Sequence, residues 1–171
     1  MARMEDENRR DCPAAAYLRQ QPETLVVNGY RNWVAGLAHA DSRYWDAAWT
    51  AHAKALGAID GQIALDAMAA LVGRLGACAT CPLRFYRPGA AHLCRDECLV
   101  LGMVSGAQHG DEDLLVQSAR LLTCTDVCAE VIESAGAYAA VLLGNSQRLT
   151  PIPLSAIADI EIRSTFAGSR A

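Results

Sequence analysis

Cysteine is the residue type in this sequence whose spacing points most directly to chemistry. Six of the seven cysteines form three short-spaced pairs, which are Cys78 with Cys81, Cys94 with Cys98, and Cys124 with Cys128. Two thiolates separated by two or three residues can converge on one metal ion, or can cycle between dithiol and disulfide. The three pairs therefore predict metal ligation or thiol redox chemistry.

The first two pairs combine into the pattern C-x2-C-x12-C-x3-C, which has the spacing of a four-ligand metal site. Four thiolates suit zinc or an iron–sulfur cluster. The first predicted ligand set is therefore Cys78, Cys81, Cys94 and Cys98. Its spacing resembles that of a zinc finger, whose second ligand pair also lies on a helix, with cysteines in place of the paired histidines. The resemblance covers the ligand spacing alone and implies no nucleic-acid binding.

A rival arrangement follows if two predicted helices form an antiparallel hairpin. One helix covers residues 91–107 and is followed by a turn over residues 108–110. The other begins at residue 111 and can continue to Leu143 with a bend near Thr123 or Gly136. The second and third cysteine pairs would then face each other with an offset of about one helical turn. The rival ligand set is Cys94, Cys98, Cys124 and Cys128, with His92 at its edge. Such twin C-x3-C hairpins resemble disulfide-stapled helical hairpins and helical copper-binding bundles. A further alternative is that Cys124 and Cys128 only fill the core, because buried free cysteine behaves as a small hydrophobe.

Arginine and aromatic side chains surround the first two pairs. The segment over residues 81–89 (CPLRFYRPG) holds two arginines and two aromatics in a chain that is only 6% aromatic. Nearby cations lower a thiol pKa, and they could equally receive an anionic partner. The simpler alternative is that the arginines are solvated and that Arg95 pairs with Asp96 or Glu97. An exposed loop of this kind is predicted to be a binding surface.

A second candidate site consists of aromatic residues at helical spacing. Trp33, Trp45, Trp49 and His52 could line a helical pocket for a planar cofactor. The favoured interpretation is that this stripe belongs to the core, with His52 buried and paired to a carboxylate or a backbone group.

Periodicity and composition define the elements that must position these residues. The chain has 171 residues, of which 52% are hydrophobic, and alanine and leucine dominate over β-branched residues, which favours helix. We predict one all-α bundle of five to six helices over residues 14–145. A cysteine-containing loop over residues 78–91 separates its third and fourth long helices. Residues 1–13 are expected to be a mobile segment, and residues 146–171 a tail that packs on the bundle or trails from it.

Several function classes receive no support from the sequence. There is no P-loop, Rossmann glycine pattern, G-x-S-x-G elbow or E-x-x-H pair, so a nucleotide cofactor is not expected and enzymatic activity stays open. The net charge of −4 and the absence of a long basic run argue against a nucleic-acid surface. No membrane span or secretory signal is predicted, so we expect a cytoplasmic protein.

The leading hypothesis is a helical protein that binds zinc or an iron–sulfur cluster through cysteines. Its role would be structural stabilisation, metallocentre handling or electron transfer. The first alternative is a thiol redox protein that uses the C-x2-C pair. The second is a metal-free helical module for protein–protein interaction, with self-association as one form of that interaction.

Overall fold

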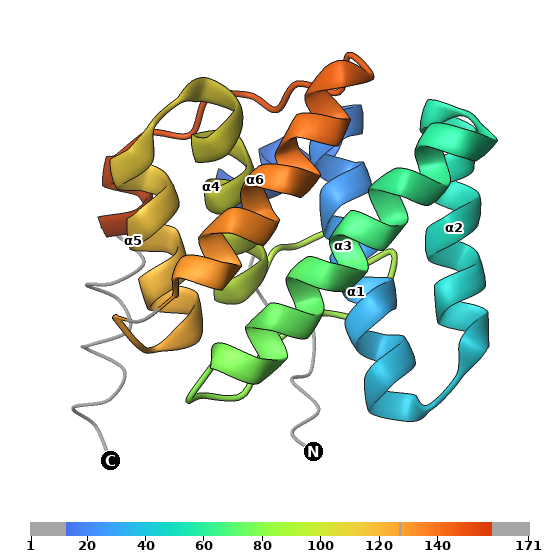
Figure 1. Cartoon of the computed structure of the whole chain (residues 1–171), viewed down its shortest axis with the longest axis horizontal. Helices are drawn as coiled ribbons and strands as arrows, with labels where there is room; N and C mark the ends of the chain where they lie inside the picture. The colour runs from blue at the N-terminus through green and yellow to red at the C-terminus, as the bar shows by residue number, and fades with distance from the viewer. Residues whose placement is uncertain (1–12, 127, 159–171) are drawn as a thin grey trace.

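The computed structural model describes residues 13–126 and 128–158, and every regular element in this part of the chain is a helix (Figure 1). The elements are η1 (Pro13–Arg19), α1 (Gln21–His39), α2 (Ser42–Leu56), α3 (Ala58–Cys78), α4 (Arg95–His109), α5 (Glu112–Thr123) and α6 (Ala129–Gly144). A short helical segment over residues 154–158 follows. The prediction of an all-α bundle of five to six long helices is confirmed.

Two helical hairpins, α2–α3 and α4–α5, reverse the chain at a glycine. Gly57 and Gly110 close them with φ of 87° and 69°, values that a residue with a Cβ rarely adopts. Inside the hairpins the backbones approach closely. A Cβ on Gly61 would lie 2.7 Å from the backbone of Ala53, and a Cβ on Gly106 would lie 2.8 Å from a backbone nitrogen of α5. Glycine at these positions therefore allows each helix pair to pack tightly.

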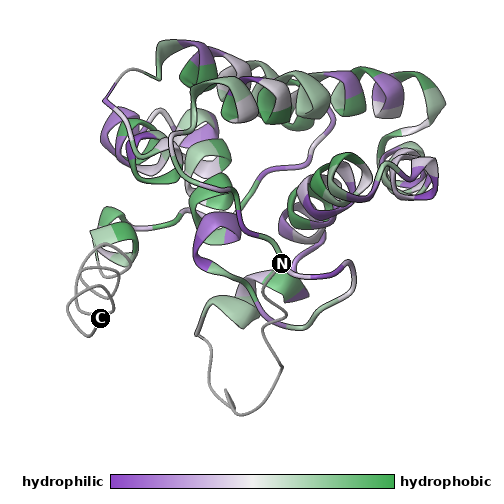
Figure 2. Ribbon diagram, turned by 90° about the horizontal axis from the view of Figure 1, so that it is seen from below, coloured by the Kyte–Doolittle hydropathy of each residue, from purple (hydrophilic) through white to green (hydrophobic). Residues whose placement is uncertain are grey.

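The core is built mainly from α1, α3, α4 and α6. Helix α6 packs against both α3 and α4, and so joins the two hairpins. Hydrophobic and hydrophilic residues alternate along the helices in Figure 2, as expected of amphipathic helices that bury one face. The largest fully buried apolar side chains are Tyr30, Met68, Leu71, Leu75, Leu99, Leu101, Met103, Leu114, Leu122, Tyr138 and Leu142.

The predicted helix after residue 111 is divided in two. The sequence allowed one helix up to Leu143, bent near Thr123 or Gly136. In the structure α5 ends at Thr123, because Cys124 takes a left-handed conformation with φ of 55°. Gly136 lies inside α6 and causes no break in that helix. The chain therefore turns at the first of the two expected positions, and the turn carries a cysteine.

Helix α4 begins later than predicted. We expected it to start near residue 91, but it starts at Arg95 with Cys94 as its N-cap residue. The Glu97 side chain accepts a hydrogen bond from the Cys94 N–H at 2.8 Å, as in one half of a capping box. The loop between α3 and α4 consequently spans residues 79–94, and both of its ends carry cysteines.

The termini of the chain lie outside the described residues. The predicted mobile segment over residues 1–13 is described only at Pro13, and the tail is described only as far as residue 158. The described part of the tail packs on the bundle, since Ile152 and Ile157 are buried and the Thr150 N–H donates to Glu23 Oε1 at 2.6 Å. Among the described helices, none is long and apolar enough to span a membrane.

Candidate functional site

The first and third cysteine pairs meet where α3 ends, α5 ends and α6 begins. These three helix ends lie together at the lower left of Figure 1. The Thr80 N–H donates to the Thr123 carbonyl at 2.9 Å, and the Thr80 hydroxyl donates to the Cys124 carbonyl at 3.0 Å. The last carbonyls of α5 lack partners within their own helix, so the loop supplies donors that they need. These bonds place the chain after α3 against the end of α5.

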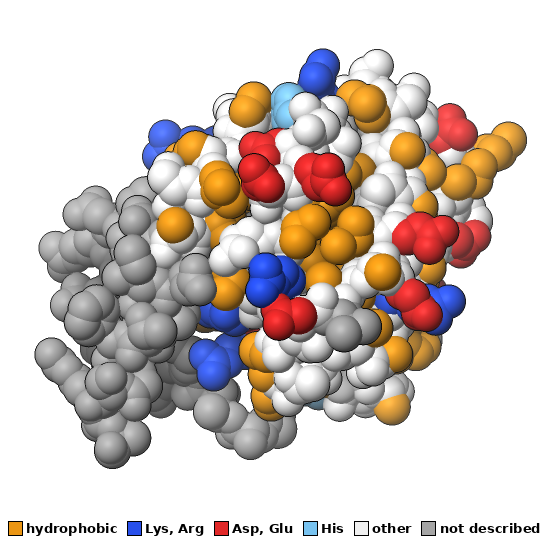
Figure 3. Space-filling model, turned by 60° about the vertical axis from the view of Figure 1, so that its left-hand side comes forward, with side chains coloured by type: hydrophobic (Ala, Val, Ile, Leu, Met, Phe, Trp, Pro, Cys, Tyr) orange, Lys and Arg blue, Asp and Glu red, His pale blue; other side chains and the backbone are white. Residues whose placement is uncertain are grey.

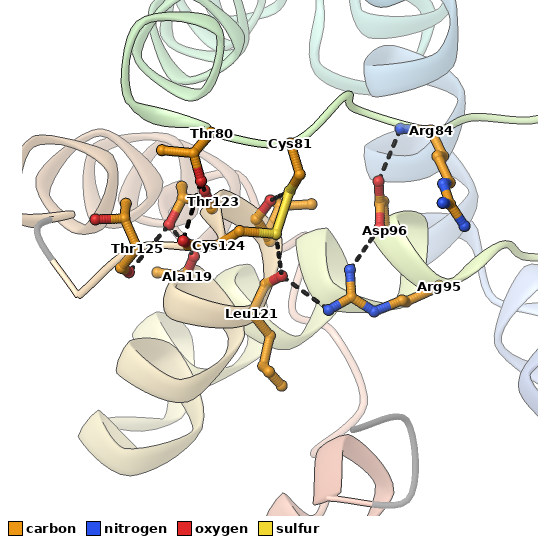
Figure 4. Close-up of a disulfide and its surroundings, with 11 residues drawn as sticks. Thr80, Cys81, Arg84, Arg95, Asp96, Ala119, Leu121, Thr123, Cys124 and Thr125 are labelled. Atoms are coloured by element: carbon orange, nitrogen blue, oxygen red, sulfur yellow. Dashed lines mark hydrogen bonds and ion pairs between the residues drawn. A yellow bond between two sulfur atoms is a disulfide. The ribbon is translucent and has the colours of Figure 1, made fainter. Parts of the chain in front are cut away.

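A disulfide joins Cys81 of the loop to Cys124 at the C-terminal end of α5 (Figure 4). The two Cα atoms are 6.1 Å apart, which lies within the usual range. Cys124 is exposed and Cys81 is half-buried. The Cys81 Sγ lies 3.6 Å from the Leu122 carbonyl oxygen. The bridge therefore ties the loop to α5 and has its Cys124 side at the surface. Because Cys124 is exposed and bonded, the alternative that it only fills the core is wrong.

Cys78 and Cys128, the remaining members of these two pairs, lie on the segments that meet at this junction, at the end of α3 and just before α6. Burial is the main cause that raises the pKa of the Cys128 thiol, and the Cys78 thiol raises that pKa further through its proximity. The ion pair between Arg74 and Glu130, 2.8 Å apart, links α3 and α6 beside the two thiols. Cys128 is buried, so the expectation that it fills the core is confirmed for this residue.

The middle pair lies in a different environment. The Cys94 Sγ is 3.5 Å from the Arg84 carbonyl oxygen, and the Cys94 thiol is close enough to Tyr30 of α1 to help raise the pKa of its phenol. Burial, with the carboxylates of Glu97 and Asp96, raises the pKa of Cys94 well above the ordinary thiol value. A thiolate at Cys94 is therefore strongly disfavoured. Cys98 lies half-buried one turn further along α4.

A buried ion pair holds the loop over residues 79–94 in place. Arg31 of α1 donates to Glu97 at 2.7 Å, and the two side chains are 1% and 0% exposed. The same guanidinium donates to the carbonyl oxygens of Ala90 at 2.9 Å and His92 at 2.5 Å. All of these bonds come from the charged guanidinium, so they hold the loop more strongly than hydrogen bonds between neutral groups would.

The acidic residues at the start of α4 also bind the backbone of the loop at further positions. The Tyr86 N–H donates to Glu97 at 2.8 Å, and the Arg84 N–H donates to Asp96 at 2.7 Å. The Arg95 side chain pairs with Asp96 at 3.2 Å, as one of the sequence alternatives expected. Sequence reasoning missed the pairing of Glu97 with Arg31. The available signal was an arginine on the apolar face of α1, where a cation needs a buried partner.

A shallow depression of about 270 Å³ opens beside the disulfide. Its lining residues are Gln117, Arg120, Leu121, Cys124, Thr125 and Asp126. Arg120 forms an ion pair with Asp126 and also lowers the pKa of Cys128. The depression leaves the Cys124 side of the bridge open to solvent.

Neither predicted metal-ligand set is present as four thiols. Cys81 of the first set is bonded to Cys124 of the rival set. Across residues 13–126 and 128–158, no group of three or more histidine, cysteine or acidic side chains is placed to hold a metal ion. His92, which was expected at the edge of the rival set, accepts a hydrogen bond from Arg31 at its backbone carbonyl. Both ligand sets, and the zinc or iron–sulfur centre expected in them, stay predictions.

The aromatic residues of the second candidate site differ in their surroundings and in their exposure. Trp33 and Trp45 pack on each other with ring centroids 5.9 Å apart, whereas Trp49 is 42% exposed. His52 is fully buried, with Nδ1 2.8 Å from a backbone carbonyl oxygen and Nε2 3.1 Å from the Tyr138 hydroxyl. The prediction of a buried histidine paired to the backbone is confirmed.

The described face that Figure 3 shows carries acidic and basic side chains scattered among hydrophobic ones, so it presents no field of a single sign. A comparison with protein families, curated proteins and solved structures finds no significant match to this chain. Its function is therefore inferred from the chemistry of the cysteine site.

Proposed function

We propose that this protein is a thiol redox protein whose redox-active group is the Cys81–Cys124 disulfide. The observation that carries this proposal is the position of the bridge, whose Cys124 lines a surface depression. The free cysteines Cys78 and Cys128 follow the same short spacings from the bonded cysteines along the chain. Cys81 comes from the C-x2-C pair, as the sequence hypothesis requires, but its bonded partner is Cys124 rather than Cys78. In the cytoplasm, which we propose as its compartment, disulfides are mostly transient or redox-sensing.

The reaction is an exchange with a dithiol reductant. One reductant thiolate attacks the Cys124 Sγ from the depression and forms a mixed disulfide, while Cys81 leaves as a thiolate and takes up a proton. The second reductant thiol then attacks the mixed disulfide and releases Cys124 as a thiol. The protein gains two electrons and two protons, and the reductant becomes a disulfide.

The surroundings of the bridge suit this exchange. The reduced Cys81 thiol can donate to the Leu122 carbonyl oxygen, which already lies 3.6 Å from its sulfur. The loop over residues 79–94 is also held by Arg31 and Glu97, independently of the disulfide. We therefore expect the bridge to open without release of the loop.

The test is a redox titration of the folded protein in dithiothreitol buffers, followed by alkylation of the thiols and mass spectrometry. We expect one two-electron transition that converts a Cys81–Cys124 peptide into two alkylated peptides. The midpoint is expected above about −300 mV, the level below which purely structural disulfides are typically found.

Cys94→Ser is the matched control for this titration. Serine is a preferred N-cap residue, so the substitution should preserve α4 and leave the transition unchanged. Cys124→Ser should abolish the transition. A bridge that stays closed in the folded protein at potentials well below −300 mV, or a transition that persists in Cys124→Ser, would refute the proposal.

Self-association is a second candidate function, because α2 and α3 expose large apolar side chains. Ile59 is 79% exposed and Ile63, one turn later, is 49% exposed, while Trp49 on the packed neighbour α2 is 42% exposed. Neighbouring exposed apolar side chains are typical of interaction surfaces. The occupant we propose is a second copy of this chain.

Light scattering across a concentration series tests this second candidate. We expect a dimer that the double variant Ile59→Lys/Ile63→Lys converts to a monomer, with no loss of helical circular dichroism. Leu143→Lys, at a position on α6 that is 42% exposed, is the control and should remain dimeric. A wild-type chain that stays monomeric at high concentration excludes self-association.

A further inference from the structure

We propose that the exchange partner of the disulfide is an acidic protein segment, which docks on the loop over residues 79–94 through Arg84 and Arg87. This inference rests on the proposed function, because it names the class of partner that meets the Cys81–Cys124 bridge. It also develops the prediction from composition that this loop is a binding surface.

The backbone of the loop is held at several points along its length. The Tyr30 hydroxyl donates to the Arg84 carbonyl at 3.2 Å, and the Ala90 N–H closes a turn by donating to the Arg87 carbonyl at 3.1 Å. These bonds add to the buried ion pair described above, so an irregular loop has a fixed shape. Long ordered connections without regular structure are usually functional, for example as binding loops.

The charge that this loop presents to solvent is positive. The loop contains two arginines, no lysine and no acidic residue, although the whole chain has a net charge of −4. Arg84 and Arg87 are both exposed, and within the described part of the chain neither guanidinium forms an ion pair or a hydrogen bond. The nearby carboxylates of Asp96 and Glu97 are buried, where they accept hydrogen bonds from backbone N–H groups of the loop.

Figure 4 shows that Arg84 lies beside the disulfide. Asp96 accepts the Arg84 N–H and pairs with Arg95. The Arg95 guanidinium donates to the Leu121 carbonyl, whose oxygen lies 3.9 Å from the Cys124 Sγ. The Arg84 side chain itself points away from the two sulfur atoms. A partner bound to this arginine would therefore lie next to the bridge and leave the Cys124 sulfur open to attack.

An acidic protein segment is the partner that suits these features. Carboxylates match guanidinium groups in charge and in fork geometry, and arginine and tyrosine are enriched at protein interfaces. Phe85 and Tyr86 lie half-buried between the two arginines and can add apolar contact. A nucleic acid is a poorer match, because its binding depends on many phosphate contacts and this chain is acidic overall. Since the loop backbone is already ordered, docking costs little conformational entropy.

Docking leaves the balance of the exchange unchanged. The two thiols of the partner become a disulfide while the Cys81–Cys124 bridge becomes two thiols, so two electrons and two protons pass to this protein. The docked charges act on the rate alone, because they bring the partner's thiolate to the Cys124 Sγ more often.

The experiment compares two synthetic dithiol peptides as reductants of the oxidised full chain. One peptide carries aspartate and glutamate around its C-x-x-C pair, and the other carries asparagine and glutamine at the same positions. Each rate is divided by the rate at which the same peptide reduces hydroxyethyl disulfide, which corrects for the reactivity of its thiols. We expect a corrected rate about tenfold higher for the acidic peptide at low salt, and no preference at about 1 M salt.

The double variant Arg84→Gln/Arg87→Gln should remove the preference for the acidic peptide. Both side chains are exposed and the loop is held through its backbone, so circular dichroism should show an intact fold. The matched control is Arg43→Gln/Arg148→Gln, which lowers the net charge equally but changes exposed arginines outside the loop. This control should keep the preference.

The outcomes separate this inference from the proposed function. Equal corrected rates for the two peptides, a preference that survives in Arg84→Gln/Arg87→Gln, or an equal loss in the control overturns the docking surface alone. An oligonucleotide that inhibits the exchange more strongly than a thiol-free acidic peptide of the same charge also overturns it, and assigns the surface to nucleic acid. A wild-type bridge that dithiothreitol does not open in the folded protein overturns the redox function, and this inference with it.

Discussion

Arg31 and Glu97 show how one pair of residues can define a loop. Both charges are almost completely buried, and together they bond the backbone of the loop at Ala90, His92, Tyr86 and Cys94. A buried charge without its partner keeps its desolvation cost and loses the compensating attraction. The contribution of the pair to stability is therefore clearest when one member is removed and the other charge stays buried.

Glu97→Ala should lower the free energy of unfolding by about 3 to 5 kcal/mol, because it leaves Arg31 buried and unpaired. Urea denaturation followed by circular dichroism measures this change. The matched control is Arg74→Ala, which removes an exposed ion pair with Glu130 and should cost under about 1 kcal/mol. Equal costs for the two variants would show that burial does not set the strength of the Arg31–Glu97 pair.

His52 should make the fold sensitive to mild acid. Burial lowers the pKa of its imidazole, so the folded state binds fewer protons than the unfolded state between that lowered pKa and about 6.5. The free energy of unfolding should consequently fall by up to about 1.4 kcal/mol for each pH unit below about 6.5 within this window. Urea denaturation at several pH values measures this slope.

His52→Leu removes the buried titrating group and should flatten the pH dependence relative to the wild type. His39→Gln changes an exposed histidine and should leave the slope unchanged. A His52→Leu variant that keeps the wild-type slope would assign the acid sensitivity to other groups.

At the scale of helices, close approach in the hairpins decides which glycines are necessary. A Cβ on Gly106 would meet backbone atoms at the N-terminal end of α5 at 2.8 and 2.9 Å. A Cβ on Gly73 of α3 would meet nothing within 4 Å. The two glycines both lie within helices, but only the first is required by packing.

Gly106→Ala should therefore destabilise the protein by about 1 to 3 kcal/mol, as overpacking does. Gly73→Ala should stabilise it by up to about 1 kcal/mol, because alanine is the better helix former. Thermal unfolding of both variants should move the Tm in opposite directions. Two shifts of the same sign would contradict the close packing of α4 against α5.

At the scale of the whole molecule, the disulfide closes a long loop. It joins positions 43 residues apart and so connects the α3–α4 loop to the turn before α6. The segments that meet at this junction also carry the free cysteines Cys78 and Cys128. The redox state of this one bond is thus expected to affect the stability of the fold.

The oxidised protein should be more stable than the reduced protein by up to about 4 kcal/mol, the chain-entropy value for a loop of this length. Denaturation with and without a phosphine reductant measures the difference. The double variant Cys81→Ser/Cys124→Ser should match the reduced wild type and should not respond to reductant. A response in that variant would assign the effect to another bond.

The sequence by itself determined the helical class, the approximate helices and the residue type that carries the chemistry. Local periodicity and turn residues fix these features, which is why the all-α bundle, the turn at Gly110 and the loop between α3 and α4 were all predictable. Spacing along the sequence also identified the three cysteine pairs, because local chain geometry alone brings together two cysteines that are separated by two or three residues.

Only the tertiary structure decided which pairs meet. Cys81 and Cys124 are far apart in sequence, as are Arg31 and Glu97, and no local pattern specifies contacts at that range. The left-handed residue at Cys124 ended a helix that periodicity alone allowed to continue, and this turn brought the third pair to the first. Which cysteines become bonded depends on how α3, α5 and α6 pack, and this packing depends on contacts throughout the core.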